Sequence, residues 1–328
     1  MWNSARFTAA LIALSLATGA WAQTAWRPDK TVEFVIPTGA GGNNDKLTRL
    51  AQKILQDRKL LPSPSLVLNR PGGNQTLAVI YTLQHPNDAH YILFLNPTIF
   101  ANELNGITKI RYTELTPLAL LVIENTVLTV RAESPFKSTG DLVARLKADP
   151  DSVSFGMPAR GGQPHLTAAA AVRAAGDDPR KMKVVVFKGS GESTTALLGG
   201  HVDVMVSSSG SVLGMVQAGQ ARVLGVAAGQ RMGGSFANAP TFREAGIDSV
   251  GIPAWRGFFG AQKLAPAQVA FWDEAFSKMA DAPDWKKNLE EGNLTQQFMR
   301  SREFGQFLDR EYTNTKAVMT DLGLVKTQ

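Results

Sequence analysis

The sequence predicts an α/β protein made of two domains. Two observations lead to this prediction: units of strand, loop and helix recur along the chain, and its 328 residues are about twice the length of a typical domain. Such repeated units favour parallel sheets with helices on both faces. No Pro- or Ser-rich linker divides the chain, so we expect it to cross between the domains at short strands. The composition, with 44% hydrophobic and 19% charged residues, is typical of a folded protein with a buried core.

The N-terminus has the pattern of a secretory signal peptide. Arg6 is followed by an uncharged run from Phe7 to Ala20, which ends in Ala20-Trp21-Ala22. We therefore expect residues 1–22 to be removed by cleavage after Ala22; the alternative is an N-terminal core helix. The run is too short for a stable membrane anchor, and no other apolar run of about 20 residues follows. The product should be soluble and exported, which means periplasmic in a cell with an outer membrane.

The first half of the mature chain contains three predicted strands, at residues 31–36, 66–68 and 91–95. A Gly-rich loop over residues 37–44 separates the first strand from a helix that should start near Asp45. Asn43 or Asn44 can cap this helix, and Asp45 suits the positive end of its dipole. The third strand is expected to run into a polar loop that carries Asn96, Thr98 and Asn102.

The second half repeats the pattern with strands at 127–130, 153–155, 184–187, 202–206 and 223–227 and a return strand at 255–260. Ser138-Thr139 should cap a helix over 141–146, and Pro164 suits a first helical turn. A short helix should end at Gly199-Gly200, and the 202–206 strand should open on a Ser-rich loop over 207–211. From Pro266 the chain is predicted to be mainly helical, with an inner stripe of Ala270, Phe271, Ala275 and Met279. The chain should cross between domains near 126–130 and 252–258, with the C-terminal helices returning to the first domain.

Two Gly-rich loops, Thr38 to Asn44 and Met157 to Gln163, are the strongest chemical signal. Each follows a strand and precedes a helix, so each can offer backbone N–H groups at the positive end of a helix. If they face each other across a cleft, they can hold the two ends of a dicarboxylate. The alternative is that both are ordinary turns between a strand and a helix.

Other functional classes lack their signatures. Gly39-Ala-Gly41-Gly42 is an incomplete dinucleotide fingerprint, and no phosphate-binding P-loop or zinc-protease helix motif occurs. Ser193 and Ser209 do not lie in a nucleophile elbow. The chain has no Cys, which excludes disulfides and thiol chemistry, and its four His leave little for a metal centre. We therefore predict no catalytic residue, no metal and no cofactor. The positive charge is scattered, which favours mild attraction for anions and not nucleic-acid binding.

Three further side chains can reach a ligand, and each has an alternative role. His165 lies beside the second loop and can bind a ligand or cap its own helix start. Arg160 can pair with a carboxylate or remain a solvated loop side chain. Arg256 can reach the cleft or stack on an aromatic ring, and its neighbour Trp255 is expected to pack at a hinge. His85 and His90 are interpreted as solvated turn residues.

Seven segments share a family likeness, in chain order: Ile36-Pro37 with Gly41-Gly42-Asn43-Asn44-Asp45, Asn69-Arg-Pro-Gly72, Phe187-Lys-Gly-Ser190, Leu197 to Met205, Ala218 to Arg222, Ala239 to Gly246, and Trp255-Arg-Gly257. Together they resemble the Bug/TctC family, the extracytoplasmic solute receptors of tripartite tricarboxylate transporters. The resemblance covers nearly the whole mature chain.

The resemblance implies a type II periplasmic-binding-protein fold, in which two α/β domains close on a small carboxylate. Domain 1 would comprise residues 23–125 plus 254–328, and domain 2 residues 126–253. The ligand would be held by the two loops, by backbone N–H groups and by bridging water. The implied ligand-binding residues, together with Arg256, are Thr38, Gly39, Ala40, Gly41, Gly42, Asn43, Asp45, Asn96, Thr98, Ala159, Arg160, Gly161, Gly162, Gln163, His165, Ser207 and Ser208.

The resemblance also implies a function, a partner and some departures. The protein should capture a di- or tricarboxylate or an aromatic carboxylate by hinge closure and, as a monomer, deliver it to permease subunits in the membrane. A sensor subunit for a membrane signalling system is the first alternative, and a secreted hydrolase is the second. The family's second-loop serine is replaced by Gly162, its acid near Ser207 is absent, and Pro158 and Arg160 are added. Losing an acid and gaining a cation favours an anionic ligand without an amino group.

Overall fold

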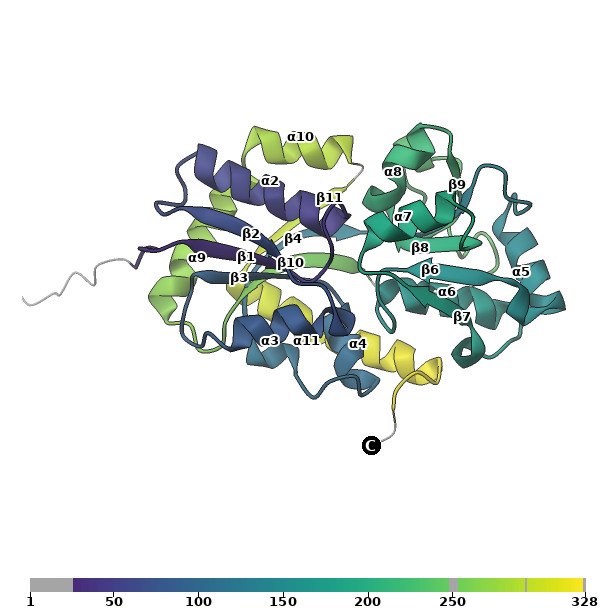
Figure 1. Ribbon diagram of the computed structural model, residues 1–328, viewed down its shortest axis with the longest axis horizontal. Coiled ribbons are helices and arrows are strands. Elements are labelled where there is room, and N and C mark those ends of the chain that lie inside the picture. The colour runs from purple at the N-terminus through teal and green to yellow at the C-terminus, as the bar shows by residue number, and fades with distance from the viewer. Residues whose placement is uncertain (1–25, 248–252, 293, 327–328) are drawn as a thin grey trace, which may run out of the picture.

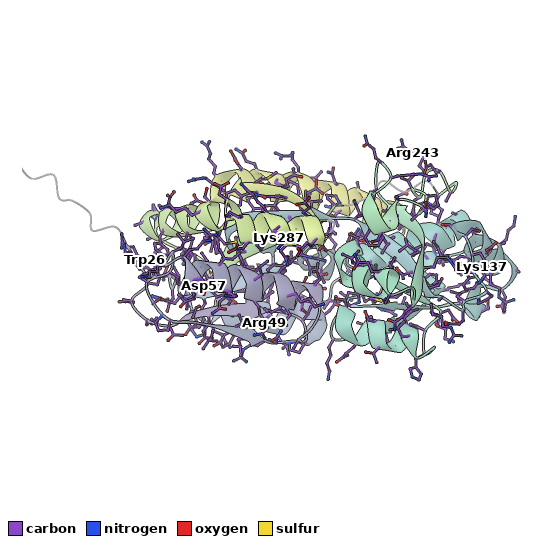
Figure 2. The ribbon with its side chains drawn as sticks, turned by 90° about the horizontal axis from the view of Figure 1, so that it is seen from above. Trp26, Arg49, Asp57, Lys137, Arg243 and Lys287 are labelled. Atoms are coloured by element: carbon purple, nitrogen blue, oxygen red, sulfur yellow. The ribbon has the colours of Figure 1, made fainter. Side chains whose placement is uncertain are left out.

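Two lobes, each a β-sheet covered by helices on both faces, make up the protein (Figure 1). This computed structural model describes residues 26–247, 253–292 and 294–326. The predicted signal peptide, residues 1–22, lies outside the described residues. Seen from above, the lobes lie side by side, with Asp57 and Lys287 on the first lobe and Lys137 on the far side of the second (Figure 2). In the described part of the chain, no helix is both long and apolar enough to cross a membrane.

The sheet of the first lobe has six strands in the order β11-β4-β10-β3-β1-β2. β1 pairs in parallel with β2 and β3, whereas β10 runs antiparallel to β3 and β4, and β11 runs antiparallel to β4. The strands are β1 (Val32–Ile36), β2 (Ser65–Asn69), β3 (Tyr91–Leu95), β4 (Thr116–Glu124), β10 (Ala254–Gly260) and β11 (Thr295–Arg300).

Alternating side chains of these strands supply two apolar surfaces, one for each layer of helices. Phe34 and Phe258 face one layer and pack with Trp272, whereas Val35 and Phe259 face the other. The first layer contains α2 (Asn43–Asp57), α9 (Pro266–Ala280) and α10 (Pro283–Glu291). The second contains α3 (Thr76–Leu83), α4 (Thr98–Leu104) and α11 (Ser301–Asp321).

The second lobe repeats this design on a five-stranded sheet in the order β7-β6-β8-β5-β9. β6 pairs in parallel with β7 and β8, and β5 runs antiparallel to β8 and β9. The strands are β5 (Thr126–Arg131), β6 (Ser154–Met157), β7 (Lys183–Val186), β8 (Val204–Ser208) and β9 (Ala221–Ala227). One face carries α5 (Thr139–Ala148) and α6 (Gln163–Ala174), and the other carries α7 (Ser190–Leu198) and α8 (Ser209–Gln217).

The chain passes between the lobes at two neighbouring places. β4 ends at Glu124 in the first sheet and β5 begins at Thr126 in the second, so Asn125 alone separates them. β9 ends in the second sheet and β10 begins at Ala254 in the first, where Ala254 is the register partner of Glu124. The two connections therefore leave the first lobe side by side. The antiparallel directions of β5 and β10 follow from these crossings. The expectation of parallel sheets is therefore confirmed only for the pairs of β1 with β2 and β3 and of β6 with β7 and β8.

Several predicted helix signals are confirmed. The Ser138 side chain accepts a hydrogen bond from the backbone of Asp141 and caps α5, as expected. Pro164 lies in the first turn of α6, and Gly199 ends α7. The structure also contains β4, β11 and α3, which the sequence analysis did not identify. The apolar runs of β4 and α3 fit either a strand or a helix, so periodicity alone did not identify them.

Other local predictions are wrong. α2 starts at Asn43 and has Gly42 as its N-cap, without a side-chain bond from either asparagine. Thr98 and Asn102 lie in α4 and not in a loop, because burial of the neighbouring apolar side chains outweighs their polar character. Of the expected 207–211 loop, residues 207 and 208 end β8 and the rest begin α8. The predicted inner stripe of α9 is confirmed at Ala275 and Met279, which are buried together with Trp272 and Phe276, but it is wrong at Ala270, which is exposed.

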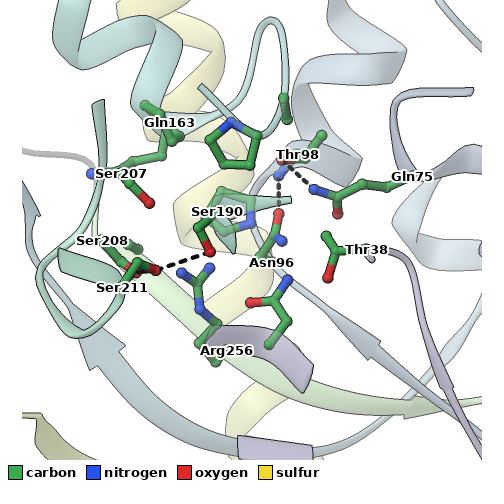
Figure 3. A pocket seen from close by; sticks show the side chains of 16 residues that line it. Thr38, Gln75, Asn96, Thr98, Gln163, Ser190, Ser207, Ser208, Ser211 and Arg256 are labelled. Atoms are coloured by element: carbon green, nitrogen blue, oxygen red, sulfur yellow. Dashed lines mark hydrogen bonds between the residues drawn. The ribbon is translucent and has the colours of Figure 1, made fainter. Parts of the chain in front are cut away.

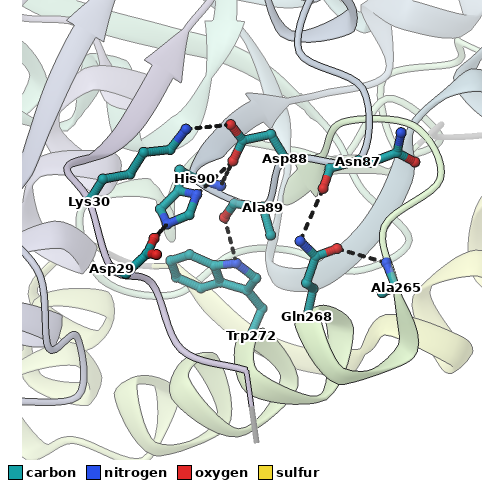
Figure 4. A network of polar contacts seen from close by, with 9 residues as sticks. All are labelled: Asp29, Lys30, Asn87, Asp88, Ala89, His90, Ala265, Gln268 and Trp272. Atoms are coloured by element: carbon teal, nitrogen blue, oxygen red, sulfur yellow. Dashed lines mark hydrogen bonds and ion pairs between the residues drawn. The ribbon is translucent and has the colours of Figure 1, made fainter. Parts of the chain in front are cut away.

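A polar network fixes the segment that leads into β1, at the end of the first lobe away from the second (Figure 4). The ring of His90 is held between Asp88, at 2.6 Å from Nδ1, and Asp29, at 3.2 Å from Nε2. Lys30 pairs with the other oxygen of Asp88 at 2.7 Å. The indole N–H of Trp272 donates to the carbonyl of Ala89 at 2.9 Å. His90 is thus a buried structural residue, and the expectation that it is a solvated turn residue is wrong.

Candidate ligand-binding site

A polar cavity lies between the two lobes, next to the crossing strands (Figure 3). It encloses about 490 Å³ when its mouth is included. The lining residues are Thr38, Asn44, Gln75, Asn96, Pro97, Thr98, Pro158, Ala159, Gln163, Pro164, Ser190, Ser207, Ser208, Ser211, Ala254 and Arg256.

The parallel strands of both sheets direct their carboxyl ends at this cavity. Thr38 follows β1, Asn96 follows β3, and Pro158 follows β6, while Ser207 and Ser208 end β8. Ligands of α/β proteins bind outside the carboxyl ends of the strands. The parallel topology therefore accounts for the convergence of these residues, which lie far apart in the sequence.

Four helices of eight or more residues begin at the same cavity. Asn44 lies in the first turn of α2, Gln163 is the first residue of α6, and Ser190 is the first residue of α7. Ser208 is the N-cap of α8, and Ser211 lies in its first turn. Each helix start carries a partial positive charge of about half a unit and backbone N–H groups without helical partners. The electrostatic field in the cavity consequently favours an anion.

Arg256 is the charged side chain among the described lining residues, and it lies on β10. Its Nη2 donates to Oε2 of Glu124 at 2.7 Å, and the exposed fractions of the two side chains are 11% and 0%. Asn43 donates to the other oxygen of Glu124. The guanidinium is thereby fixed against the wall of the cavity, and stacking on an aromatic ring does not explain its position.

Unpaired polar atoms gather at the cavity. Of the described residues that line it, three have a buried polar atom without a hydrogen-bond partner: Oγ1 of Thr38, Oε1 of Gln75 and Nε of Arg256. Each such atom costs about 1–3 kcal/mol when it is left unpaired away from water. A ligand or bound water that pairs with them recovers this free energy.

On the side of the second lobe, hydroxyl groups form a short chain. The Oγ atoms of Ser208 and Ser211 are 2.9 Å apart, and Ser211 donates to Oγ of Ser190 at 3.1 Å (Figure 3). A hydroxyl can both donate and accept, so this chain adapts to the groups that it meets.

Several amides of the first Gly-rich loop are already paired within the protein. Gly39 N–H donates to the carbonyl of Lys188 in the other lobe at 3.0 Å. Gly41 N–H donates to Asp45 at 3.0 Å. Burial raises the pKa of Asp45, but hydrogen bonds from Arg49, Gly41 and Asn69 outweigh it and hold that pKa below its ordinary value. Asp45 thus fixes the shape of the loop from outside the cavity.

The second loop is fixed in a similar way. Asn74 of the first lobe makes two hydrogen bonds with the backbone of Arg160: its amide group donates to the carbonyl at 2.7 Å and accepts from the N–H at 3.1 Å. Gly161 N–H donates to Nδ1 of His165 at 3.0 Å. Asn74 and Gln75 both have positive φ, at 51° and 78°, which is strained for residues other than glycine. This turn brings Asn74 to the second loop and Gln75 to the cavity.

The buried ring of His165 is neutral at physiological pH. Burial, with a smaller contribution from the charge of Arg160, lowers the pKa of His165 from 6.5 to about 4. Because Nδ1 accepts the Gly161 N–H, the ring proton is on Nε2. His165 therefore holds the loop in shape, and its side chain does not line the cavity.

This lowered pKa predicts an acid dependence of stability. Between pH 6.5 and about 4 the unfolded chain binds a proton at His165 that the folded protein does not bind, so the free energy of unfolding falls as the pH falls through this window. At pH 4.5 the loss from this group is about 2.5 kcal/mol. His165→Asn retains an acceptor for Gly161 and should lose this part of the dependence. Urea unfolding at pH 7 and pH 4.5 measures it, with exposed His201→Asn as the control; an unchanged dependence in His165→Asn would contradict the assignment.

The predicted ligand residues divide into two groups. Those that line the cavity are Thr38, Asn96, Thr98, Ala159, Gln163, Ser207, Ser208 and Arg256. Those that lie behind it and shape or connect the loops are Gly39, Ala40, Gly41, Gly42, Asn43, Asp45, Arg160, Gly161, Gly162 and His165. The contact of either group with a ligand stays a prediction.

Several lining residues were not predicted individually as ligand contacts, although Asn44 and Pro158 lie in the two predicted loops. They are Asn44, Gln75, Pro97, Pro158, Pro164, Ser190, Ser211 and Ala254. Ser190 lies in a segment that carries the family likeness, which was a usable signal. Gln75 gave none, because it reaches the cavity only through the left-handed turn that follows Asn69-Arg-Pro-Gly72. Trp255 is fully buried among Phe100, Phe259 and Phe304 and does not line the cavity.

Comparisons with known proteins agree with this architecture. The chain is 28% identical to the UPF0065 protein in gbd 5' region of Cupriavidus necator over 330 residues, which cover 99% of this chain and 97% of that protein. It is 26% identical to protein BugT of Bordetella pertussis over 232 residues, which cover 70% and 69% of the two chains.

Solved structures share the fold. The periplasmic binding protein BugD superposes with a TM-score of 0.84 at 19% identity, covering 92% of this chain and 100% of that chain. MatC from Rhodopseudomonas palustris with bound malate gives 0.81 at 23% identity, covering 89% and 99%. An R. palustris protein with adipate gives 0.83 at 21% identity, covering 91% and 99%. The predicted type II periplasmic-binding-protein fold is confirmed.

The sequence model of the tripartite tricarboxylate transporter family receptor matches residues 48–324, which is most of the chain. The resemblance found in the sequence is therefore confirmed, and this protein belongs to the tripartite tricarboxylate transporter receptor family of solute-binding proteins.

Proposed function

We propose that this protein is a periplasmic receptor that captures a small aliphatic organic acid between its lobes and delivers it to a tripartite tricarboxylate-type permease. The observation that carries this proposal is the convergence of four helix starts and Arg256 on one cavity with unpaired polar atoms. No chemical step is part of the proposed function, and the cavity residues act as hydrogen-bond donors and acceptors.

A carboxylate fits this cavity for physical reasons. Removing a carboxylate from water costs several kcal/mol unless its oxygens are hydrogen-bonded and its charge is balanced. The backbone N–H groups of helix starts, the unpaired Nε of Arg256 and the serine hydroxyls can provide those bonds. An ammonium group would meet the positive ends of four helices and a guanidinium, so we expect the ligand to lack an amino group.

The lining also limits the size and shape of the ligand. The described lining residues include three proline rings, at Pro97, Pro158 and Pro164, but no aromatic side chain that could stack on a ring. An aliphatic acid is therefore favoured over an aromatic one. Malate and adipate, which are bound in two proteins of the same fold, are acids of this kind.

We propose that ligand binding is coupled to closure of the two lobes about a hinge. Hydrogen bonds join the lobes on two sides of the cavity: Gly39 to Lys188, and Asn74 to Arg160. These bonds break when the lobes separate, so closure forms them together with the ligand contacts. We propose residues 23–125 plus 254–328 as one moving domain and 126–253 as the other, with the hinge in the neighbouring connections at Asn125 and before Ala254.

We propose the permease as partner because of the family membership. We also propose that the receptor acts as a monomer after residues 1–22 are cleaved off. A sensor subunit would use the same closed form, and comparing solute uptake with transcriptional response in a deletion strain separates the two roles. No feature of the site favours the hydrolase.

Ligand screening of the purified protein tests the proposal. Aliphatic mono- and dicarboxylates of three to six carbons should raise the unfolding temperature, because a ligand at 100 times its Kd stabilises the folded state by about 2.7 kcal/mol. Amino acids and benzoates should raise it much less. Isothermal titration calorimetry then gives the Kd of each acid that shifts the temperature. If none of the acids binds, the proposal is wrong, and if only amino acids bind, the cavity recognises a different class.

A further inference from the structure

A buried carboxylate lies directly behind the one charged side chain described in the cavity lining. Glu124 is the last residue of β4, at the point where the chain leaves the first lobe, and only 2% of it is exposed. Oε2 accepts from Nη2 of Arg256 at 2.7 Å, and Oε1 accepts from the side chain of Asn43. The charge of Glu124 is therefore fixed beside the guanidinium.

The same carboxylate lies against the first turn of α8 in the other lobe. A methyl group placed on Gly210 would be 3.2 Å from Oε1 of Glu124. Gly210 is the second residue of α8, so the carboxylate approaches the positive end of that helix. Glu124 thus faces two of the sources of positive charge that we expect to attract a ligand, Arg256 and the start of α8.

This arrangement reduces the positive potential of the cavity. The described side chains that line the cavity include one cation, Arg256. Glu124 does not line the cavity but pairs with the guanidinium and balances its charge. The first carboxylate of a ligand can use the unpaired Nε of Arg256 and the helix starts. A second carboxylate meets no further cationic side chain among the described lining residues and is repelled by Glu124. Charges within about 8 Å of each other in a partly buried site change affinity by about ten-fold or more.

We propose that Glu124 is a specificity-determining residue that weakens binding of a ligand's second carboxylate. This inference rests on the proposed function, because it concerns the charge of the acid that the cavity accepts. Glu124 acts through the electrostatic potential and through Arg256, and it does not line the cavity itself.

Pairs of ligands that differ by one charge test the inference. The probes are succinate with succinamate and adipate with adipamate, in which a carboxamide replaces one carboxylate at nearly constant size. Calorimetry gives the affinity ratio of the diacid to its half-amide. Glu124→Gln keeps an acceptor for Arg256 and removes the charge, and we expect it to raise this ratio about ten-fold or more. Glu124→Asp keeps the charge and should leave the ratio within about three-fold of the wild-type value.

A further variant serves as a matched control. Glu133→Gln removes an exposed charge from the loop after β5 and should leave the ratio unchanged. An equal shift in Glu124→Gln and Glu124→Asp, or no shift in Glu124→Gln, overturns the inference while the proposed function stands. If no diacid or half-amide binds to the wild-type protein, the proposed function fails first.

Discussion

Replacing Arg256 with methionine is expected to lower the affinity for the bound acid about 100-fold. The substitution removes the guanidinium whose Nε has no partner within the described residues, and a hydrogen bond to a charged group contributes about 1.5–3 kcal/mol. It also leaves Glu124 buried without its cation. Loss of one partner of a buried ion pair destabilises a protein by about 3–5 kcal/mol. The unfolding temperature should therefore fall together with the affinity.

Calorimetry and thermal unfolding measure the two effects of Arg256→Met. Arg243→Met is the control, because Arg243 is exposed on the second lobe (Figure 2) and should change neither quantity. The double variant Arg256→Met with Glu124→Leu removes both charges and should recover most of the stability but not the affinity. Full affinity in the double variant would show that Arg256 does not contact the ligand.

Substitutions at Gly162 are expected to prevent closure while each lobe stays folded. Gly162 precedes α6 with φ of −71° and ψ of 179°, which any residue adopts without strain. A methyl group placed there would lie 2.6 Å from Oγ1 of Thr98, which belongs to α4 of the other lobe. The lobes must then separate to relieve the contact. We expect Gly162→Ala to weaken ligand binding about ten-fold and Gly162→Val about 100-fold or more, with little change in urea unfolding of the unliganded protein.

Two comparisons identify the cause of this effect. Gly214→Ala places a methyl group in open space on α8, so it should leave binding unchanged and stabilise the protein slightly. Combining Gly162→Ala with Thr98→Ala removes the opposing hydroxyl and should restore part of the affinity lost by Gly162→Ala, relative to Thr98→Ala alone. Small-angle X-ray scattering with saturating acid should find Gly162→Val more open than the wild type. Unchanged affinity in Gly162→Val would mean that the lobes do not close at this contact.

Local patterns of apolar and turn residues predicted most of the helices and strands. Alternating or continuous apolar runs bounded by glycine and proline gave β1, β3, β6 and β9 to within two residues at each end, and Ser138 gave the start of α5. β4 and α3 were missed, because a short apolar run fits either a strand or a helix. The start of α8 was read as a loop from its serines, although tertiary packing makes it helical.

The candidate site was predicted only in outline. Thr38 and Gln163 were identified because each lies in a Gly-rich loop between a strand and a helix, and this pattern is visible in the sequence. Gln75 could not be identified, because it reaches the cavity only through the strained backbone turn at Asn74 and Gln75, which the local sequence does not indicate. The pairing of Glu124 with Arg256 joins residues 132 positions apart, and nothing in either local sequence indicates it.

By itself the sequence determined the class of fold, the family and the two loops that flank the cleft, because short-range patterns of apolar and turn residues encode them. The tertiary structure alone decided which side chains line the cavity and which loop amides are already paired. It also decided that the charge of Arg256 is balanced from behind. These properties depend on the order and direction of the strands in two sheets. Strand pairing brings together residues that are far apart in the sequence, and the local sequence does not indicate which of them meet.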